Sequence, residues 1–129
     1  MITQKIVNDL AYKIVGCAIE VHKQLGPGLL ENIYERCLKY ELELNGLKVK
    51  TQIPVEVIYK GKKIDSDLRL DLLVEDLIIV ELKAAETLCD EHSIQLLNYL
   101  RATNIEVGLL LNFGKKPQIA RKIYPNINK

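Results

Sequence analysis

The stretch Leu68–Lys83, LRLDLLVEDLIIVELK, consists of two apolar segments joined by Glu75-Asp76. Apolar and branched side chains dominate both segments, and an acidic pair between them is typical of a turn. We therefore predict two neighbouring antiparallel strands, Lys63–Val74 and Leu77–Lys83. Both faces of the second strand are apolar as far as Glu81, which is typical of a strand in the middle of a sheet.

Charged side chains interrupt these apolar segments at Asp71, Glu81 and Lys83. Successive strand residues point to opposite faces, so Glu81 and Lys83 share a face, about 6–7 Å apart. One interpretation is a partly exposed strand end at which both charges are solvated. The other is a metal-binding carboxylate beside a lysine that handles a proton or a phosphate. Asp65 and Asp67 lie farther along the first strand, and we expect both to be solvated.

The connection between the two strands decides where Asp71 points, because directly opposed residues share a face. A two-residue loop would set Asp71 opposite Val80, away from Glu81. A three-residue loop or a bulge would set it beside Glu81. We predict the longer connection, and a plain two-residue hairpin would count against a site. Converging carboxylates repel each other unless a cation lies between them, and oxygen ligands suit Mg²⁺ or Mn²⁺.

The rest of the chain predicts an α/β (α+β) fold, a mixed central sheet flanked by helices in the order ααβββαβ. Apolar residues at helical spacing predict helices over Lys5–Leu25, Leu29–Leu44 and Asp90–Thr103, the last capped by Asp90 or Ser93. Gly26-Pro27-Gly28 and Asn45-Gly46 end the first two helices. After Gly46 the hydrophobic period changes to two, which predicts a further strand, and Pro54 makes this strand an edge strand or a bulged one. Further predictions are a hairpin turn at Tyr59–Lys62, a buried strand at Val107–Leu111 and a polar tail at Lys115–Lys129 with one more short element.

Length and composition indicate one globular domain, 1–129, because 129 residues with 48% hydrophobic and 27% charged residues can form a single core. The net charge of +1 gives no overall attraction to nucleic acid or an anionic membrane, so any basic surface is local. Basic residues gather near the first hairpin and after the last strand, as phosphate-binding patches or solvated faces: Lys48, Lys50, Lys60, Lys62 and Lys63, then Lys115, Lys116, Arg121 and Lys122.

The cysteines and the apolar runs indicate a compartment. Cys17, Cys37 and Cys89 form no CxxC pair, which excludes a disulfide framework and a zinc site and predicts three reduced, packed thiols. No apolar run approaches the roughly 18 residues of a membrane span. We therefore expect a cytoplasmic protein without a membrane anchor. His22 is expected at the surface, and His92 as a cap or a solvated residue at the start of the third helix.

Three motifs resemble one enzyme family. Asp71 followed by Glu81-Leu82-Lys83 resembles the D…ExK core of the PD-(D/E)XK nuclease superfamily, with Leu70 where the motif has proline. The segment Gly28–Tyr34, GLLENIY, matches the GxxExxY signature of a small family in that superfamily. Gln95–Tyr99, QLLNY, matches the QxxxY motif of its RecB-like exonuclease branch. The resemblance extends from about Leu10 to Tyr124 and implies a restriction-endonuclease-like core.

The resemblance also implies roles for individual residues. Asp71 and Glu81 would be metal ligands, with the backbone carbonyl of Leu82 as a third ligand. Lys83 would orient or deprotonate the attacking water, and Glu31 would be a further acidic ligand or water-positioning group; otherwise Glu31 is a solvated helix-start carboxylate. Two more residues lie four apart on one helical face and would contact the site or the DNA backbone, or else form a buried hydrogen-bonded pair: Gln95 and Tyr99.

The sequence contains no GxxxxGK[ST], GxGxxG, HExxH or GxSxG motif, so two functions remain. The first is a Mg²⁺- or Mn²⁺-dependent nuclease, a hydrolase of phosphodiester bonds in DNA rather than RNA. The alternative is a non-catalytic module with the nuclease fold that binds nucleic acid or a protein partner. A homodimer is a further hypothesis, because so small a nuclease would need a second subunit to form a groove.

Overall fold

The structure, a computed structural model, describes residues 1–129 and begins with two helices. Helix α1 covers Gln4–Leu25 and starts at Thr3, whose side chain accepts a hydrogen bond from the Ile6 amide. Helix α2 covers Glu31–Leu44. It ends as predicted at Asn45-Gly46, where Gly46 takes a φ of 79° that glycine adopts without strain. None of the helices is both long and apolar enough to cross a membrane.

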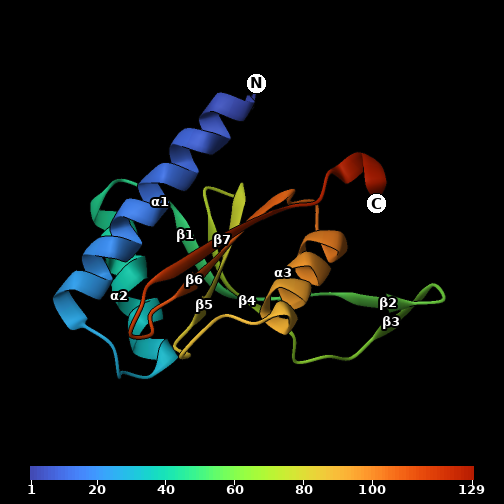
Figure 1. The fold of residues 1–129 in the computed structure, drawn as a ribbon. Coiled ribbons are helices and arrows are strands. Elements are labelled where there is room, and N and C mark those ends of the chain that lie inside the picture. The colour runs from blue at the N-terminus through green and yellow to red at the C-terminus, as the bar shows by residue number, and fades with distance from the viewer.

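A five-stranded mixed sheet forms the centre of the fold, in the order β1-β4-β5-β6-β7. Only β5 and β6 run parallel, and α3, Asp90–Ala102, lies between them in the chain (Figure 1). A two-stranded ribbon, β2–β3, projects beyond the sheet, and the short helix η1 follows β7. The strands are β1 Val49–Pro54, β2 Val57–Tyr59, β3 Lys62–Ile64, β4 Arg69–Val74, β5 Ile78–Lys83, β6 Val107–Asn112 and β7 Gln118–Ile123, and η1 is Asn126–Asn128.

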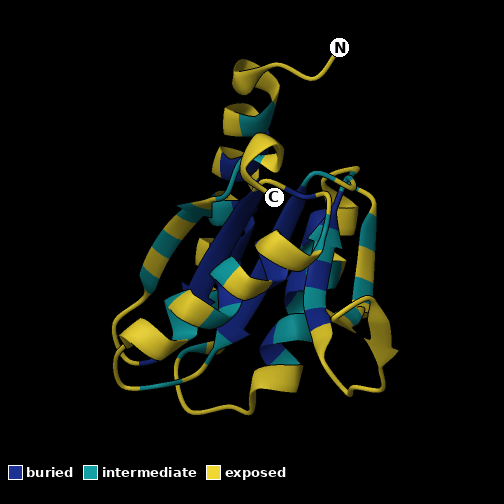
Figure 2. Ribbon diagram, turned by 90° about the vertical axis from the view of Figure 1, so that its right-hand side faces the viewer, coloured by how far each residue is buried: buried dark blue, intermediate teal, exposed yellow.

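Helices cover both faces of this sheet, so the fold has three layers. On one face α1 and α2 bury a cluster that includes Ile14, Tyr34 and Leu72. On the other face α3 buries a second cluster that includes Ile79 and Leu100. Figure 2 shows that the buried residues concentrate in the central strands. The prediction of a mixed sheet flanked by helices is confirmed, and β6 is buried along its whole length, as expected for a covered strand.

The prediction of a single strand over Lys63–Val74 is wrong, because this stretch belongs to two strands, β3 and β4. Residues 65–68 have no regular structure, and the Leu68 amide donates to Oγ of Ser66. Asp, Ser and Asp at 65–67 favour such a local turn over a ladder. Asp65 and Asp67 are exposed, as expected.

The polar tail Lys115–Lys129 contains two elements, β7 and η1, where the sequence predicts one short element without naming its type. This strand alternates between half-buried and exposed residues at the edge of the sheet. An edge strand buries only one face, and its apolar content is therefore too low to stand out. The order is thus ααβββββαββ rather than ααβββαβ.

The first strand fulfils one of the two alternatives for Pro54, because β1 is at the edge of the sheet. Gln52 has a φ of 50° and interrupts the pairing with β4, but the register is the same on both sides of it, so no extra residue is inserted and β1 has no bulge. The hairpin turn is confirmed as well, since Lys60 and Gly61 have φ values of 50° and 77° between β2 and β3.

Four smaller predictions have mixed outcomes. The N-cap of α3 is Cys89 and neither Asp90 nor Ser93, because the His92 side chain accepts a hydrogen bond from the Cys89 amide. His92 is therefore part of the cap, as predicted. His22 is half-buried rather than at the surface. The three cysteines form no disulfide, but only Cys17 is buried and Cys89 is exposed.

Candidate active site

The β4–β5 connection sets the geometry of the site. It has three residues, Glu75–Leu77, and the ladder pairs Leu72 with Val80 and Val74 with Ile78. Glu75 and Asp76 take φ values of 53° and 54°, which this tight connection requires. Continuing the register by one residue sets Asp71 opposite Glu81. The predicted three-residue connection is therefore confirmed.

Asp71 and Glu81 join the two strands by crossed hydrogen bonds. The Asp71 amide donates to Oε2 of Glu81 at 2.7 Å, and the Leu82 amide donates to Oδ2 of Asp71 at 2.9 Å. Side chains thus replace the backbone ladder beyond the Leu72–Val80 pair. No N–H of the protein donates to the second oxygen of either carboxylate, the two carboxyl groups lie within hydrogen-bonding range of each other, and no partnerless polar atom is fully buried. Both second oxygens are accessible to solvent.

Burial disfavours the ionised form of the Glu81 carboxyl group. The residue is only 5% exposed, and burial followed by the nearby charge of Asp71 raises the pKa of Glu81 to about 8. The Asp71 amide and the positive charge of Lys83 act in the opposite direction. Lys83 follows two residues later and is half-buried, so the structure brings Asp71, Glu81 and Lys83 together. A cation beside the two free oxygens would relieve the repulsion.

Helix α2 contributes a third carboxylate that the sequence analysis missed, Glu35. The Gln52 side chain donates to Oε1 of Glu35 at 2.7 Å. Gln52 lies opposite Asp71 in the β1–β4 register. Burial, and also the negative charge of Asp71, raise the pKa of Glu35, while the hydrogen bond from Gln52 lowers it. Glu31, one turn earlier, is exposed, and no hydrogen bond or ion pair joins it to the site.

The sequence could have pointed to Glu35 through its spacing from Glu31, because residues four apart on a helix share a face.

Helix α3 supplies the polar pair Gln95 and Tyr99 from the other side. Nε2 of Gln95 donates to the Tyr99 hydroxyl at 3.1 Å. Burial raises the pKa of Tyr99, and the charges of Glu81 and Asp71 raise it further. The hydroxyl therefore lies within electrostatic range of both carboxylates and stays protonated.

Next to this pair is an open hollow of about 450 Å³, lined by Leu68, Glu91, His92, Ile94, Gln95, Asn98 and Tyr99.

Asn112, another residue that the sequence analysis missed, fixes the chain directly after Lys83. It is buried at the end of β6, opposite Lys83, and hydrogen bonds to both the amide and the carbonyl of Ala85 at 3.0 Å. The Phe113 amide donates to the Lys83 carbonyl at 2.8 Å. A polar residue at the end of the apolar run Val107–Leu111 was the available signal.

The segment Gly28–Tyr34 anchors the start of α2. The fully buried Tyr34 donates its hydroxyl proton to the Gly26 carbonyl at 2.6 Å and accepts from the Leu29 amide at 3.2 Å. Its ring stacks on Phe113 at 4.7 Å between centroids. His22 contacts the same ring and hydrogen bonds to the Gly114 carbonyl. Tyr34 is thus a packing residue that orients α2 toward the end of β5.

Few side chains of the site could act as metal ligands. No group of three or more His, Cys, Asp or Glu side chains is arranged to hold a metal ion. Mg²⁺ is commonly held by only one or two carboxylates, with waters and substrate phosphates completing its coordination. The two free oxygens of Asp71 and Glu81 fit that requirement.

Comparison with known families identifies the chain. A family model described as "PD-(D/E)XK nuclease superfamily" matches residues 8–122. The chain belongs to the PD-(D/E)XK nuclease superfamily. The matched range contains the three strands and the one helix that surround the paired carboxylates, which are β1, β4, β5 and α2. Divalent metal use and nucleic acid binding are general properties of this superfamily.

One solved structure supports the fold of this superfamily member. The structure titled "Crystal structure of SSO0001" matches with a TM-score of 0.60 at 23% sequence identity. The match covers 74% of this chain and only 50% of that one, so the chain spans about half the length of this relative. Comparison with curated proteins found no match.

Proposed function

We propose that this chain is a metal-dependent nuclease that hydrolyses phosphodiester bonds of DNA, and less readily of RNA. Within the superfamily we assign it to the GxxExxY family and the RecB-like exonuclease branch, on the segments Gly28–Tyr34 and Gln95–Tyr99. The crossed pair Asp71–Glu81 supports the proposal best, because two ionised carboxylates this close repel each other, and a bound cation would stabilise both in the ionised form.

Each residue has a role in this proposal. Asp71, Glu81 and the Leu82 carbonyl would hold Mg²⁺ or Mn²⁺, with Glu31 or Glu35 from α2 positioning a water. When bound, the cation supplies positive charge that polarises the phosphoryl oxygen and acidifies a water. As a neutral amine, Lys83 would take up the proton of the attacking water. As an ammonium, it would instead orient that water and neutralise charge on the phosphate.

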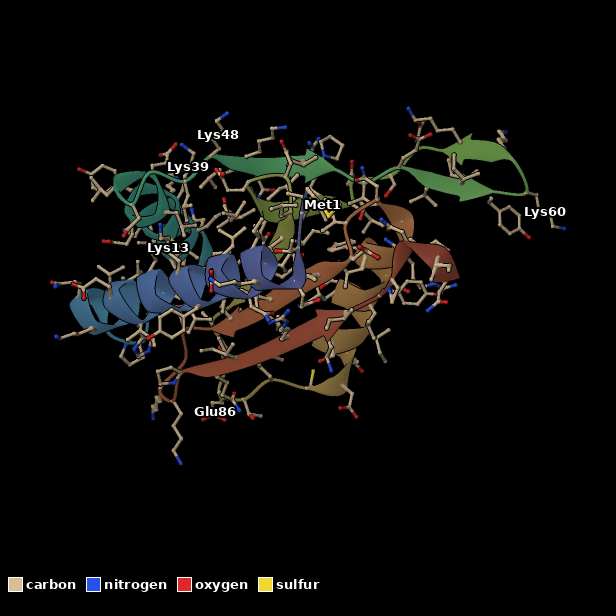
Figure 3. All side chains as sticks on the ribbon, turned by 90° about the horizontal axis from the view of Figure 1, so that it is seen from above. Met1, Lys13, Lys39, Lys48, Lys60 and Glu86 are labelled. Carbon is tan, nitrogen blue, oxygen red and sulfur yellow. The ribbon has the colours of Figure 1, made fainter.

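The surface around the site offers contacts for a nucleic acid strand. Gln95 and Tyr99 would donate hydrogen bonds to a phosphate next to the one that is cleaved, and the hollow on α3 would accept the adjoining nucleotide. The β2–β3 ribbon carries Lys60, Lys62 and Lys63, and Figure 3 shows Lys60 at its projecting tip. These lysines would contact phosphates farther along the strand.

A non-catalytic module that binds nucleic acid or a protein is the second candidate. In its favour, no third His, Cys, Asp or Glu side chain joins the two carboxylates as a metal ligand. We further propose a cytoplasmic location, which three unpaired cysteines support, and a homodimer, whose second subunit would supply another wall of a groove.

The test is cleavage of labelled single- and double-stranded DNA and RNA with Mg²⁺ or Mn²⁺. The native protein is compared with Asp71→Asn and Lys83→Ala at matched purity. The control is Asp65→Asn, because Asp65 is exposed and outside the site. We expect cleavage by the native protein and the control, and none by the two site variants.

Cleavage that persists in both site variants would place the chemistry elsewhere. If no protein cleaves any substrate, the binding module becomes the better interpretation.

A further inference from the structure

The outer face of α1 carries a set of side chains that nothing in the chain covers. Figure 1 shows α1 at the periphery of the molecule, with α2 beside it. Tyr12 is 84% exposed and Ile19 is 54% exposed, although both are large apolar side chains. They lie one turn on either side of Gly16, opposite the buried row of the helix. The two side chains are about two helical turns apart on one face, and a partner that packs along that face would cover both.

Gly16 has no structural reason within the chain. It lies inside a helix of 22 residues, where glycine is less favourable than alanine by about 1 kcal/mol. A Cβ atom added at this position would meet nothing within 4 Å, and its φ is not positive. Neither packing nor backbone conformation in the single chain therefore requires glycine. Its absent side chain does open the helix surface to close approach by another helix.

On this face, each charged residue before Gly16 has a residue of opposite charge at a similar distance after Gly16. Asp9 lies seven residues before Gly16 and Lys23 seven residues after it. Lys13 lies three before it and Glu20 four after it. In an antiparallel pair of α1 helices related by a two-fold axis at Gly16, each of these charges would therefore face an opposite charge.

The same axis also matches the apolar residues. By helix geometry, Tyr12 and Ile19 lie on one side of Gly16, and Lys13 and Glu20 lie on the other. Tyr12, Lys13 and Glu20 all line the hollow between α1 and α2, and Ile19 lies outside it. A two-fold axis perpendicular to the plane of the two helices brings the Tyr12–Ile19 side of one helix against the same side of the other. It does the same for the Lys13–Glu20 side. Tyr12 would then pack on Ile19 of the partner subunit, and Lys13 would lie beside Glu20 of the partner subunit.

The contacts that these charges make within the chain are weak. Asp9 pairs with Lys5, and Glu20 accepts from Gln24, in both cases between exposed residues one turn apart. Lys13 and Lys23 make no ion pair or side-chain hydrogen bond. Between α1 and α2 an open hollow of about 450 Å³ lies over Gly16, bordered by Glu41 and Asn45 of α2. It would accept part of a partner helix.

We propose that a second copy of this chain docks on the outer face of α1, forming a two-fold antiparallel α1–α1 dimer centred on Gly16. The proposal does not depend on nuclease activity, because α1 supplies none of the site residues. A single helix pair is a small interface, so we expect dissociation in the micromolar range.

Sedimentation equilibrium between about 1 and 200 µM tests this proposal. Lys13→Glu alone, or Glu20→Lys alone, brings like charges together at both contacts and should weaken the dimer about tenfold or more. The double variant Lys13→Glu/Glu20→Lys restores opposite charges and should recover the dimer. Lys60→Glu, at the ribbon tip, should leave the dimer unchanged.

Gly16→Leu provides a steric test that does not threaten folding, since open space surrounds Gly16 and leucine favours a helix. We expect a monomer with an undiminished melting temperature. A native protein that stays monomeric at 200 µM would overturn the proposal. So would a dimer that survives Gly16→Leu, or a double charge reversal that fails to restore what the single reversals lose.

Discussion

Among single residues, Glu81 makes the stability of the metal-free protein depend on pH. The carboxyl has a pKa of about 8 in the folded chain, against an ordinary value of 4.5. Between these values the unfolded chain has released the proton that the folded chain still holds. Stability should therefore fall as pH rises from about 5 to 8, by on the order of a few kcal/mol.

Urea denaturation in EDTA at pH 5, 6.5 and 8 measures this dependence. Glu81→Gln removes the titrating group and should flatten most of the slope. Glu35 has a pKa raised by burial, so a smaller slope of the same sign should remain. An equally steep slope in Glu81→Gln would mean that another group is responsible.

Tyr99 gives a second prediction at this scale. Its hydroxyl accepts a hydrogen bond from Gln95 and lies near the two carboxylates. Tyr99→Phe keeps the packing and loses one hydrogen bond, so the free energy of unfolding should fall by only about 1 kcal/mol. If the hydroxyl donates to a phosphate, DNA affinity should fall about tenfold, as measured by fluorescence anisotropy in EDTA. Unchanged affinity would make Tyr99 a purely structural residue.

The site residues differ in how far the sequence could predict them. Asp71 and Glu81 could be paired because strand parity and loop length are local properties that limit the register to two choices. The sequence marks Glu35 by its spacing from Glu31 and Asn112 by its place at the end of an apolar run, but it does not assign either residue a role. Those roles depend on where α2 and the end of β6 meet other strands, and contacts between elements far apart in the chain leave no periodic pattern.

At the scale of elements, the loop after β5 depends on Gly114. A Cβ atom added there would lie 2.0 Å from the Ala85 carbonyl oxygen, which is backbone and cannot rotate away. Gly114→Ala should therefore displace the loop from Asn112 and cost about 2–4 kcal/mol of unfolding free energy. Gly16→Ala is the matched control, and it should instead gain up to about 1 kcal/mol. Equal effects in chemical denaturation would contradict this description of the loop.

In the ribbon β2–β3, a contribution to DNA binding can be tested without changing the stability of the fold. Lys60, Lys62 and Lys63 are exposed, so replacing all three by alanine should leave the melting temperature almost unchanged. If they contact phosphates of duplex DNA, affinity should fall and the dependence of log K on log salt should weaken by up to about 3. Lys39→Ala on α2 controls for a general loss of positive charge. A slope that does not change would remove the ribbon from the DNA-binding surface.

The elements themselves were predictable where periodicity is strong and not where it is weak. Helices α1, α2 and α3 have apolar residues at regular helical spacing, and their ends fall within two residues of the predicted ones. Strand β7 was not identified as a strand and the break between β3 and β4 was missed, because short exposed segments bury too little apolar surface to produce a pattern.

At the scale of the whole molecule, a bound cation should couple the site to global stability. Asp71 and Glu81 join β4 to β5 only when the chain is folded, so a cation that binds both stabilises the folded state alone. The gain grows as RT ln(1 + [metal]/Kd), which is about 2.7 kcal/mol at a hundredfold excess over Kd. Thermal melting with Mn²⁺ or Mg²⁺ from 0 to 20 mM should therefore show a rise that continues with concentration.

The variants decide whether this rise comes from the paired carboxylates. Asp71→Asn should abolish it, whereas Asp65→Asn should keep it, because Asp65 is exposed and lies outside the β4–β5 ladder. The rise should also be larger at pH 8 than at pH 6, since at the lower pH the cation must displace the proton that Glu81 holds. A rise of equal size in Asp71→Asn would assign metal binding to another surface and leave the paired carboxylates without their proposed ligand.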